Sequence, residues 1–176
     1  MLDYLCKIYS QEFYMLYAKF ELQNTSAKKS VQILNSALKL QLKDDQLCEI
    51  YKLLVQIVNK NFGLIEARPV YQDALENLND DNAIKFGLEY AKVEQDVGEI
   101  DRARSILVYT SQMCRLDRYQ DFWAHWQSFE VEFGNDETVR EMLRIKNSVS
   151  IKFSNNHFGF VTSELPEDAP SNFIFK

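Results

Sequence analysis

Residues 121–134 read DFWAHWQSFEVEFG, and this stretch holds both tryptophans of the chain, Trp123 and Trp126, within one helical turn. A ligand cage, a platform on which nucleic-acid bases stack, and ordinary core packing all use such aromatic residues. A core position in a repeat protein recurs along the chain at a fixed interval, whereas a ligand cage is not expected to recur in register. The distribution of similar positions therefore distinguishes the three interpretations.

Similar positions do recur along the chain. The copies share a glycine or threonine with a glutamate or asparagine four positions earlier: Glu21–Thr25, Asn59–Gly63, Glu94–Gly98 and Glu130–Gly134. Shortly afterwards, each copy has a small residue or valine: Ser30, Ala67, Ala103 and Val139, at spacings of 37, 36 and 36 residues. Each of these anchors opens the i, i+3, i+4, i+7 apolar stripe of an amphipathic helix. The pattern predicts four helix pairs, of which the second copy is the weakest.

The first helix of each pair carries bulky residues seven, four and one position before the glutamate. The clearest are Tyr14, Tyr17 and Phe20 in the first copy, Tyr90 in the third, and Trp123, Trp126 and Phe129 in the last. Trp123 and Trp126 thus stand where Tyr14 and Tyr17 stand in another copy. We interpret the two tryptophans as core residues, so the cage and the stacking platform lose their strongest candidates.

The chain is therefore expected to be all-α, a right-handed α-solenoid of about four helix pairs over residues 1–153. The expected helices span 4–23, 26–41, 45–61, 65–78, 81–96, 100–114, 118–132 and 136–153. The expected N-caps, whose side chains accept hydrogen bonds from first-turn amides, are Asp44, Asp80 and Asn135. The expected left-handed C-caps are Gly63, Gly98 and Gly134.

Residues 154–176, SNNHFGFVTSELPEDAPSNFIFK, show no helical stripe and contain two of the three prolines. We expect an extended tail here. The candidate anchors, which would dock on the solenoid or on a partner, are Phe158, Phe160, Phe173 and Phe175. A frayed terminus is the equal alternative.

Charged residues suggest ion pairs inside the repeats. Glu94 precedes Arg104 by ten residues, and Glu130 precedes Arg140 by ten. In a hairpin of two helices, this offset predicts two partly buried ion pairs, each within one helix pair. Such pairs fix register more than they add stability, because desolvation offsets the Coulomb attraction. The alternative is that these are unrelated, solvated charges.

Composition and motifs exclude several classes of function. The net charge of −6 disfavours direct nucleic-acid binding, because duplex-binding proteins carry a basic face. The three cysteines and two histidines form no zinc signature, and no phosphate-loop, dinucleotide-binding or nucleophile-elbow motif occurs. No apolar run is long enough to span a bilayer. We expect no enzyme activity, no metal or other cofactor, no small-molecule substrate and no membrane partner.

Two longer stretches resemble a known repeat class. Aromatic residues three apart before Phe-Glu, followed by the Ala-Arg helices of EARPVYQDAL (66–75) and IDRARSILVYTSQ (100–112), resemble HAT (half-a-TPR) repeats. More narrowly, GEIDRAR (98–104) with DFWAHWQSFEVEFGNDETVREMLRIKNSV (121–149) is similar to the C-terminal repeats of SYF-type splicing scaffolds, also called XPA-binding proteins. The narrow match covers about residues 80–150, and the repeat-level similarity covers about 10–153.

The resemblance implies a non-catalytic protein–protein scaffold of pre-mRNA splicing in the nucleus. Its partners would be proteins of the spliceosomal NineTeen complex and intron-binding complex, with RNA nearby only through the assembly. The structural repeat positions would be Tyr14, Tyr17, Phe20, Glu21, Tyr90, Glu94, Gly98, Ala103, Arg104, Trp123, Trp126, Phe129, Glu130, Gly134 and Arg140. The alternatives are a HAT scaffold of 3′-end cleavage or ribosomal-RNA processing, and a direct RNA-binding module.

Overall fold

The computed structural model describes residues 11–161, with the backbone alone for Gln11 and for 152–161. Helices connected by short turns make up this part of the chain, and it contains no strand. The helices are α2 (Gln11–Asn24), α3 (Ala27–Ala37), α4 (Asp44–Phe62), α5 (Leu64–Asn77), α6 (Asp80–Asp96), α7 (Ile100–Ser111), α8 (Gln120–Phe133) and α9 (Asp136–Val161). The chain divides into two compact units between Thr110 and Ser111. The prediction of an all-α fold is confirmed.

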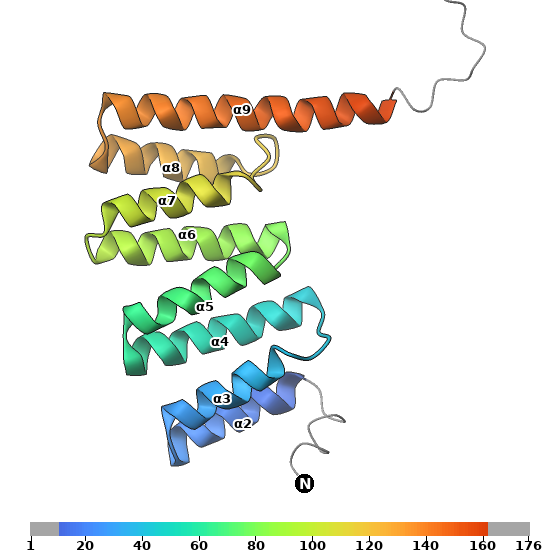
Figure 1. Ribbon diagram of the computed structural model, residues 1–176, viewed down its shortest axis with the longest axis vertical. Helices are drawn as coiled ribbons and strands as arrows, with labels where there is room; N and C mark the ends of the chain where they lie inside the picture. The colour runs from blue at the N-terminus through green and yellow to red at the C-terminus, as the bar shows by residue number, and fades with distance from the viewer. Residues whose placement is uncertain (1–10, 162–176) are drawn as a thin grey trace, which may run out of the picture. The chain divides into compact units, whose positions relative to one another are not determined.

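The first unit consists of the antiparallel pairs α2–α3, α4–α5 and α6–α7, which stack in chain order (Figure 1). The anchors Ser30, Ala67 and Ala103 are each 0% exposed, because a small side chain lets the two helices of a pair approach closely. Ser30 also donates a buried hydrogen bond of 2.7 Å from its hydroxyl to the carbonyl oxygen of Ala18. The predicted register of the second helices is therefore present in all three pairs of this unit.

Aromatic rings hold successive pairs of the first unit together. The rings of Tyr71 on α5 and Tyr90 on α6 stack with 4.6 Å between their centroids. Phe86 on α6 packs edge-on against Tyr71, and also against Tyr51 on α4. Offset and edge-on ring pairs of this kind add to the free energy gained by burying apolar area. The core of the unit thus runs from one helix pair into the next.

The second unit contains the helix pair α8–α9, and the tryptophans lie in its core. Trp123 and Trp126 are each 1% exposed, with ring centroids 5.7 Å apart, and Phe122 packs edge-on against both. The Trp126 indole N–H donates to Glu130 Oε1 at 3.1 Å. Both rings are buried in the core of this unit, so neither ring presents an exposed face to a ligand.

Two predicted core positions do not follow the stripe. Phe20, expected on the packed face of the first helix, is 58% exposed. Leu143, four residues after Val139, is 44% exposed, whereas Met142 is buried. Steps of three residues fall short of a full helical turn, so successive positions drift around the helix, and only part of a wide predicted face becomes buried.

The end of the last helix was predicted wrongly. We expected a helix to residue 153 and an extended tail from 154, but α9 continues to Val161. The loss of an apolar stripe does not end a helix when no proline interrupts its hydrogen bonds, and the next proline is Pro166. Phe158 and Phe160 therefore lie within α9, whereas Phe173 and Phe175 lie outside the described residues. Their role as docking anchors stays a prediction.

Two of the three predicted left-handed glycines are confirmed. Gly63 and Gly98 have φ of 93° and 84°, in the region that glycine adopts at little cost. Gly134 was predicted wrongly, because its φ is −99°. A Cβ at this position would overlap the Thr138 hydroxyl and both the carbonyl and the carboxylate of Glu130. Glycine is needed there for space and not for backbone conformation.

The predicted N-caps have three different outcomes. Asn135 is confirmed, because its side-chain oxygen accepts from the amides of Glu137 and Thr138 at 2.9 and 3.0 Å. The cap of α6 is Asn79, one residue before the predicted Asp80. Asp44 is the first residue of α4 instead of its cap. Its carboxylate reaches the start of α6, where it accepts from Asn79 N at 2.7 Å and from Asn82 Nδ2 at 2.5 Å.

Candidate functional site

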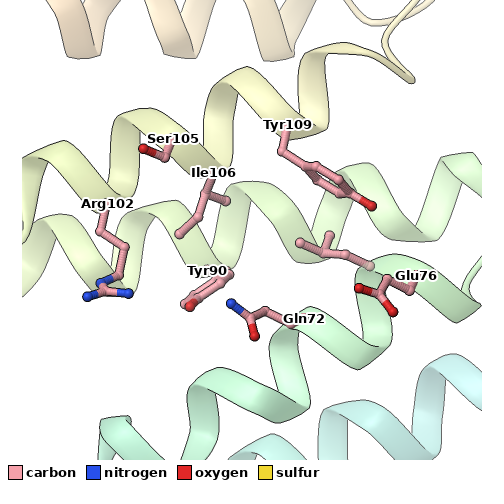
Figure 2. Close-up of a pocket in the computed structure, with 8 residues that line it drawn as sticks. Gln72, Glu76, Tyr90, Arg102, Ser105, Ile106 and Tyr109 are labelled. Atoms are coloured by element: carbon pink, nitrogen blue, oxygen red, sulfur yellow. The ribbon is translucent and has the colours of Figure 1, made fainter.

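A groove of about 440 Å³ opens on the surface of the first unit, between α5 and α7 and above α6 (Figure 2). The residues that line it are Gln72, Leu75, Glu76, Tyr90, Arg102, Ser105, Ile106 and Tyr109. They come from three helices that are separate in sequence, so the groove exists only because successive pairs stack. A concave, partly apolar site of this size is a normal place for a ligand or a partner side chain to bind.

Helical periodicity explains why these residues meet. The four lining positions on α7 follow the i, i+3, i+4, i+7 rule, so they share one face of that helix. Leu75, Tyr90 and Ile106 are buried and form an apolar floor. Tyr109 is 49% exposed and stands at the margin of this floor. The site therefore combines a hydrophobic base with a polar margin.

The margin of the groove carries opposite charges at its two ends. Arg102 stands at one end and Glu76 at the other, with Gln72 between them (Figure 2). The Arg102 side chain is 44% exposed, and its Nε lies 3.7 Å from Glu94 Oε2. Glu76 is exposed. The groove is thus electrically asymmetric along its length.

A buried ion pair lies next to the groove. Glu94 on α6 is 0% exposed, and it accepts two hydrogen bonds of 2.8 Å from Arg68 Nε and Nη2 on α5. The hydrogen bonds to this carboxylate raise the pKa of Arg68 above its usual value, so the guanidinium stays charged. Two-pronged Arg–carboxylate pairs have a fixed geometry. This one joins the second helix of one pair to the first helix of the next.

The predicted partners of the two buried glutamates are therefore corrected. Glu94 pairs with Arg68, 26 residues earlier, and more distantly with Arg102; Arg104 forms its ion pair with Asp101 at 2.9 Å. A ten-residue offset would require the charges to face each other across one hairpin, whereas α5 already faces this side of α6. In the second unit, Glu130 accepts from Trp126, and Arg140 is exposed.

A second groove, of about 410 Å³, lies between α3 and α5 and above α4. Three of its lining residues stand 37 positions before residues of the first groove: Asn35 before Gln72, Leu38 before Leu75, and Lys39 before Glu76. Tyr51 on its floor donates to Asp73 Oδ2 at 2.6 Å; burial, and then this hydrogen bond, raise the Tyr51 pKa. The grooves are therefore a product of the repeat, one at each of the two junctions between pairs in the first unit.

The predicted site residues are distributed over several elements. Tyr90 forms part of the groove floor, Glu94 is buried beside it, and Ala103 lies on the buried face of α7. Gly98 forms the turn between α6 and α7. Arg104 lies on α7 without lining the groove, and the remaining repeat positions lie in α2, α8, α9 and the turn that follows α8. Sequence reasoning missed the residues at the groove margin, because they lie outside the apolar stripe. The 37-residue offset between the two grooves is a signal only for the marginal residues of α5.

Residues 11–161 contain no group of three or more metal-ligating side chains. No helix among the same residues has the length and apolarity to cross a membrane. The Cys48 thiol is buried, and burial raises its pKa, which disfavours a reactive thiolate.

Stacked helix pairs with small-residue contacts and recurrent lateral grooves define a helical-repeat interaction module. A family model described as "Pre-mRNA-splicing factor Syf1/CRNKL1 C-terminal HAT repeat" matches residues 2–172, and the chain belongs to this family. The predicted HAT-type resemblance is thereby confirmed. The right-handed superhelical twist of the solenoid and the number of its repeats stay predictions.

Several splicing factors are similar to this chain. It is 44% identical over 147 residues to pre-mRNA-splicing factor cwf3 of Schizosaccharomyces pombe, an alignment covering 83% of this chain and 18% of that protein. It is 35% identical to the Drosophila melanogaster syf1 homolog (83% and 16% covered) and 33% identical to SYF1 of Rattus norvegicus (89% and 18% covered). The chain thus spans less than a fifth of the length of these relatives.

Proposed function

We propose that this chain is a non-catalytic protein–protein scaffold of pre-mRNA splicing that works in the nucleus as part of the spliceosome. The observation that carries this proposal is the match of the Syf1/CRNKL1 repeat family over residues 2–172. Relatives from a yeast, an insect and a mammal all bear the name of a pre-mRNA-splicing factor. Their common name supports one role for the shared region.

The geometry of the first unit supports scaffolding. The α5–α7 groove has an apolar floor and a polar margin, and the second groove also combines apolar with polar residues, which is the composition of a protein–protein contact. The floor residues are held by the core beneath them, so the surface is already formed before a partner arrives. A preformed surface of this kind reduces the entropic cost of association.

The partners we propose are proteins of the NineTeen complex and the intron-binding complex. RNA would then lie close to the chain through the assembly instead of through a dedicated basic face. The local charges support this, because three arginines pair with neighbouring acids: Arg104 with Asp101, Arg115 with Asp117, and Arg144 with Glu141. Such pairing leaves less positive charge available for phosphates.

The test is affinity purification of the full 176-residue chain from nuclear extract after nuclease treatment, followed by mass spectrometry. We expect NineTeen and intron-binding proteins to be recovered, because protein contacts survive the loss of RNA. An unrelated helical-repeat chain of similar net charge is the control. Recovery of 3′-end-cleavage or ribosome-assembly factors in their place would contradict the proposal.

A further inference from the structure

We propose that the α5–α7 groove binds one short amphipathic helix of a partner protein. This helix would carry an acidic residue, two adjacent apolar residues and a basic residue at positions i, i+3, i+4 and i+7, in either direction along its chain. The proposal rests on the scaffold function proposed above and adds to it the chemistry of the bound segment.

The length of the groove sets the length of the segment. Its α7 wall runs from Arg102 to Tyr109, seven residues, which is about 10 Å at the rise of an α-helix. Two turns of a second helix have the same length. A helix laid in a groove contacts it through positions i, i+3, i+4 and i+7. The apolar floor of Leu75 and Ile106 lies in the middle of the groove, so the apolar residues of the partner belong at i+3 and i+4.

The charges at the two ends set the charges of the segment. Arg102 is only loosely engaged, because Glu94 lies 3.7 Å from it and is already held at 2.8 Å by Arg68. Its exposed guanidinium can therefore bind a carboxylate of the partner. Glu76, at the other end, is exposed and forms no ion pair among the described residues, so it favours a basic residue (Figure 2). Complementary charges select partners and their orientation.

The same charges argue against nucleic acid as the occupant. A phosphate backbone is uniformly negative, and Glu76 would repel it at one end of the groove. Arg102, at the other end, is the single cationic side chain that lines the groove, which is little for a chain of phosphates. A segment that carries both signs of charge satisfies both ends.

The test is photo-crosslinking from the groove itself. Tyr109, at its margin and 49% exposed, is replaced by p-benzoyl-phenylalanine in the full chain, which is then irradiated in nuclease-treated nuclear extract. We expect mass spectrometry to identify crosslinked protein segments that carry the acidic–apolar–apolar–basic pattern. Crosslinked segments without that pattern would overturn the proposal, as would crosslinking mainly to RNA in untreated extract.

Two serines provide a matched pair of variants. Ser105 and Ser36 are both exposed helix residues whose hydroxyls donate to the carbonyl four residues earlier, at 2.8 and 2.9 Å. Ser105 lines the groove, and Ser36 lines neither groove. Ser105→Arg should reduce the crosslink yield at least about tenfold, because a long side chain fills the site. Ser36→Arg should leave it unchanged, and equal yields from the two variants would overturn the proposal.

Removal of the charge gives a finer test. Arg102→Gln should lower the yield about threefold, since the attraction to the partner's carboxylate is lost without placing a second carboxylate beside the buried Glu94. Lys92→Gln, which removes a positive charge at an exposed position of α6, is the control. If splicing proteins co-purify but none crosslinks to position 109, the groove proposal fails and the scaffold function stands. If no splicing protein is recovered at all, the scaffold function fails.

Discussion

Gly98 and Gly134 occupy the same place in two successive repeats, four residues after a buried glutamate, yet different forces require them. Gly98 has φ of 84° and nothing within 4 Å of a Cβ built upon it. Gly134 has an ordinary negative φ, and an added Cβ would meet the side chains of Glu130 and Thr138. A glycine that recurs in register is thus required for its backbone conformation in one copy and for its small size in another.

The largest effect is expected for Gly134→Ala. The new methyl would overlap the Glu130 backbone as well as two side chains, so the turn between α8 and α9 must shift. We expect a loss of about 3 kcal/mol in the free energy of unfolding. Tryptophan fluorescence in a urea titration reports it directly, since both tryptophans lie in α8. If Gly134→Ala cost no more than Gly98→Ala, crowding at Gly134 would be contradicted.

At a third glycine, Gly87, the cost of an added methyl group can be reduced by shortening the side chain that it would overlap. Gly87 lies inside α6, and a Cβ there would overlap the buried Thr110 side chain of α7. Gly87→Ala should cost about 2 kcal/mol, because the gain in helix propensity only partly offsets the overlap. Thr110→Ala in the same chain should recover most of that loss. Additive costs in this double-mutant cycle, followed by circular dichroism, would show that the two positions do not interact.

Gly98→Ala should cost less than either crowded position, about 1 kcal/mol. The surrounding space is open, so the whole penalty comes from a Cβ at positive φ. Gly63→Ala should cost more than Gly98→Ala, because ψ of 173° places Gly63 in a region of positive φ that is nearly confined to glycine, although its surroundings are equally open. Both costs are measured by chemical denaturation with circular dichroism; a cost at Gly98 above about 2 kcal/mol would indicate crowding that the structure does not show.

The smallest expected effect is the difference between asparagine and alanine at Gly98 and at Gly134. Asparagine tolerates positive φ better than alanine does, so Gly98→Asn should be less destabilising than Gly98→Ala by about 0.5 kcal/mol. At Gly134 the order should reverse, because asparagine is larger and space is the constraint. The midpoints of urea unfolding for the four variants provide the check. The same order at both glycines would contradict the packing explanation of Gly134.

Much of the fold could be predicted because helical stripes and small anchors are local patterns. The tight contacts within pairs were predicted from the small residues Ser30, Ala67 and Ala103. The core positions of Trp123 and Trp126 were predicted from the recurrence of aromatic residues. The helix end at Val161 could not be predicted in this way, because hydrogen bonding continues after an apolar stripe stops. The negative φ of Gly134 was also not predicted, because the repeat register gives the position of a residue in the repeat and not the atoms around it.

The candidate site was less accessible to sequence reasoning. The grooves arise where α3, α5 and α7 lie side by side above the first helices, which depends on how pairs stack. The partner of Glu94 was missed for the same reason. A spacing of ten residues suggested a contact within one hairpin, but Arg68 reaches it from the preceding pair. Contacts between pairs become visible only when the positions of two repeats are considered together.

The Asp44 carboxylate has a mechanical consequence. It joins the start of α4 to the start of α6 through Asn79 and Asn82, across 35 and 38 residues of chain that include the whole of α5. A force pulling these two helix starts apart is therefore resisted by these two hydrogen bonds together with the ring contact between Tyr51 and Phe86, before the covalent chain is extended. Once they rupture, the intervening hairpin can lengthen to roughly 120 Å when fully stretched. The carboxylate thus contributes to the force at which this helix pair begins to unfold and extend.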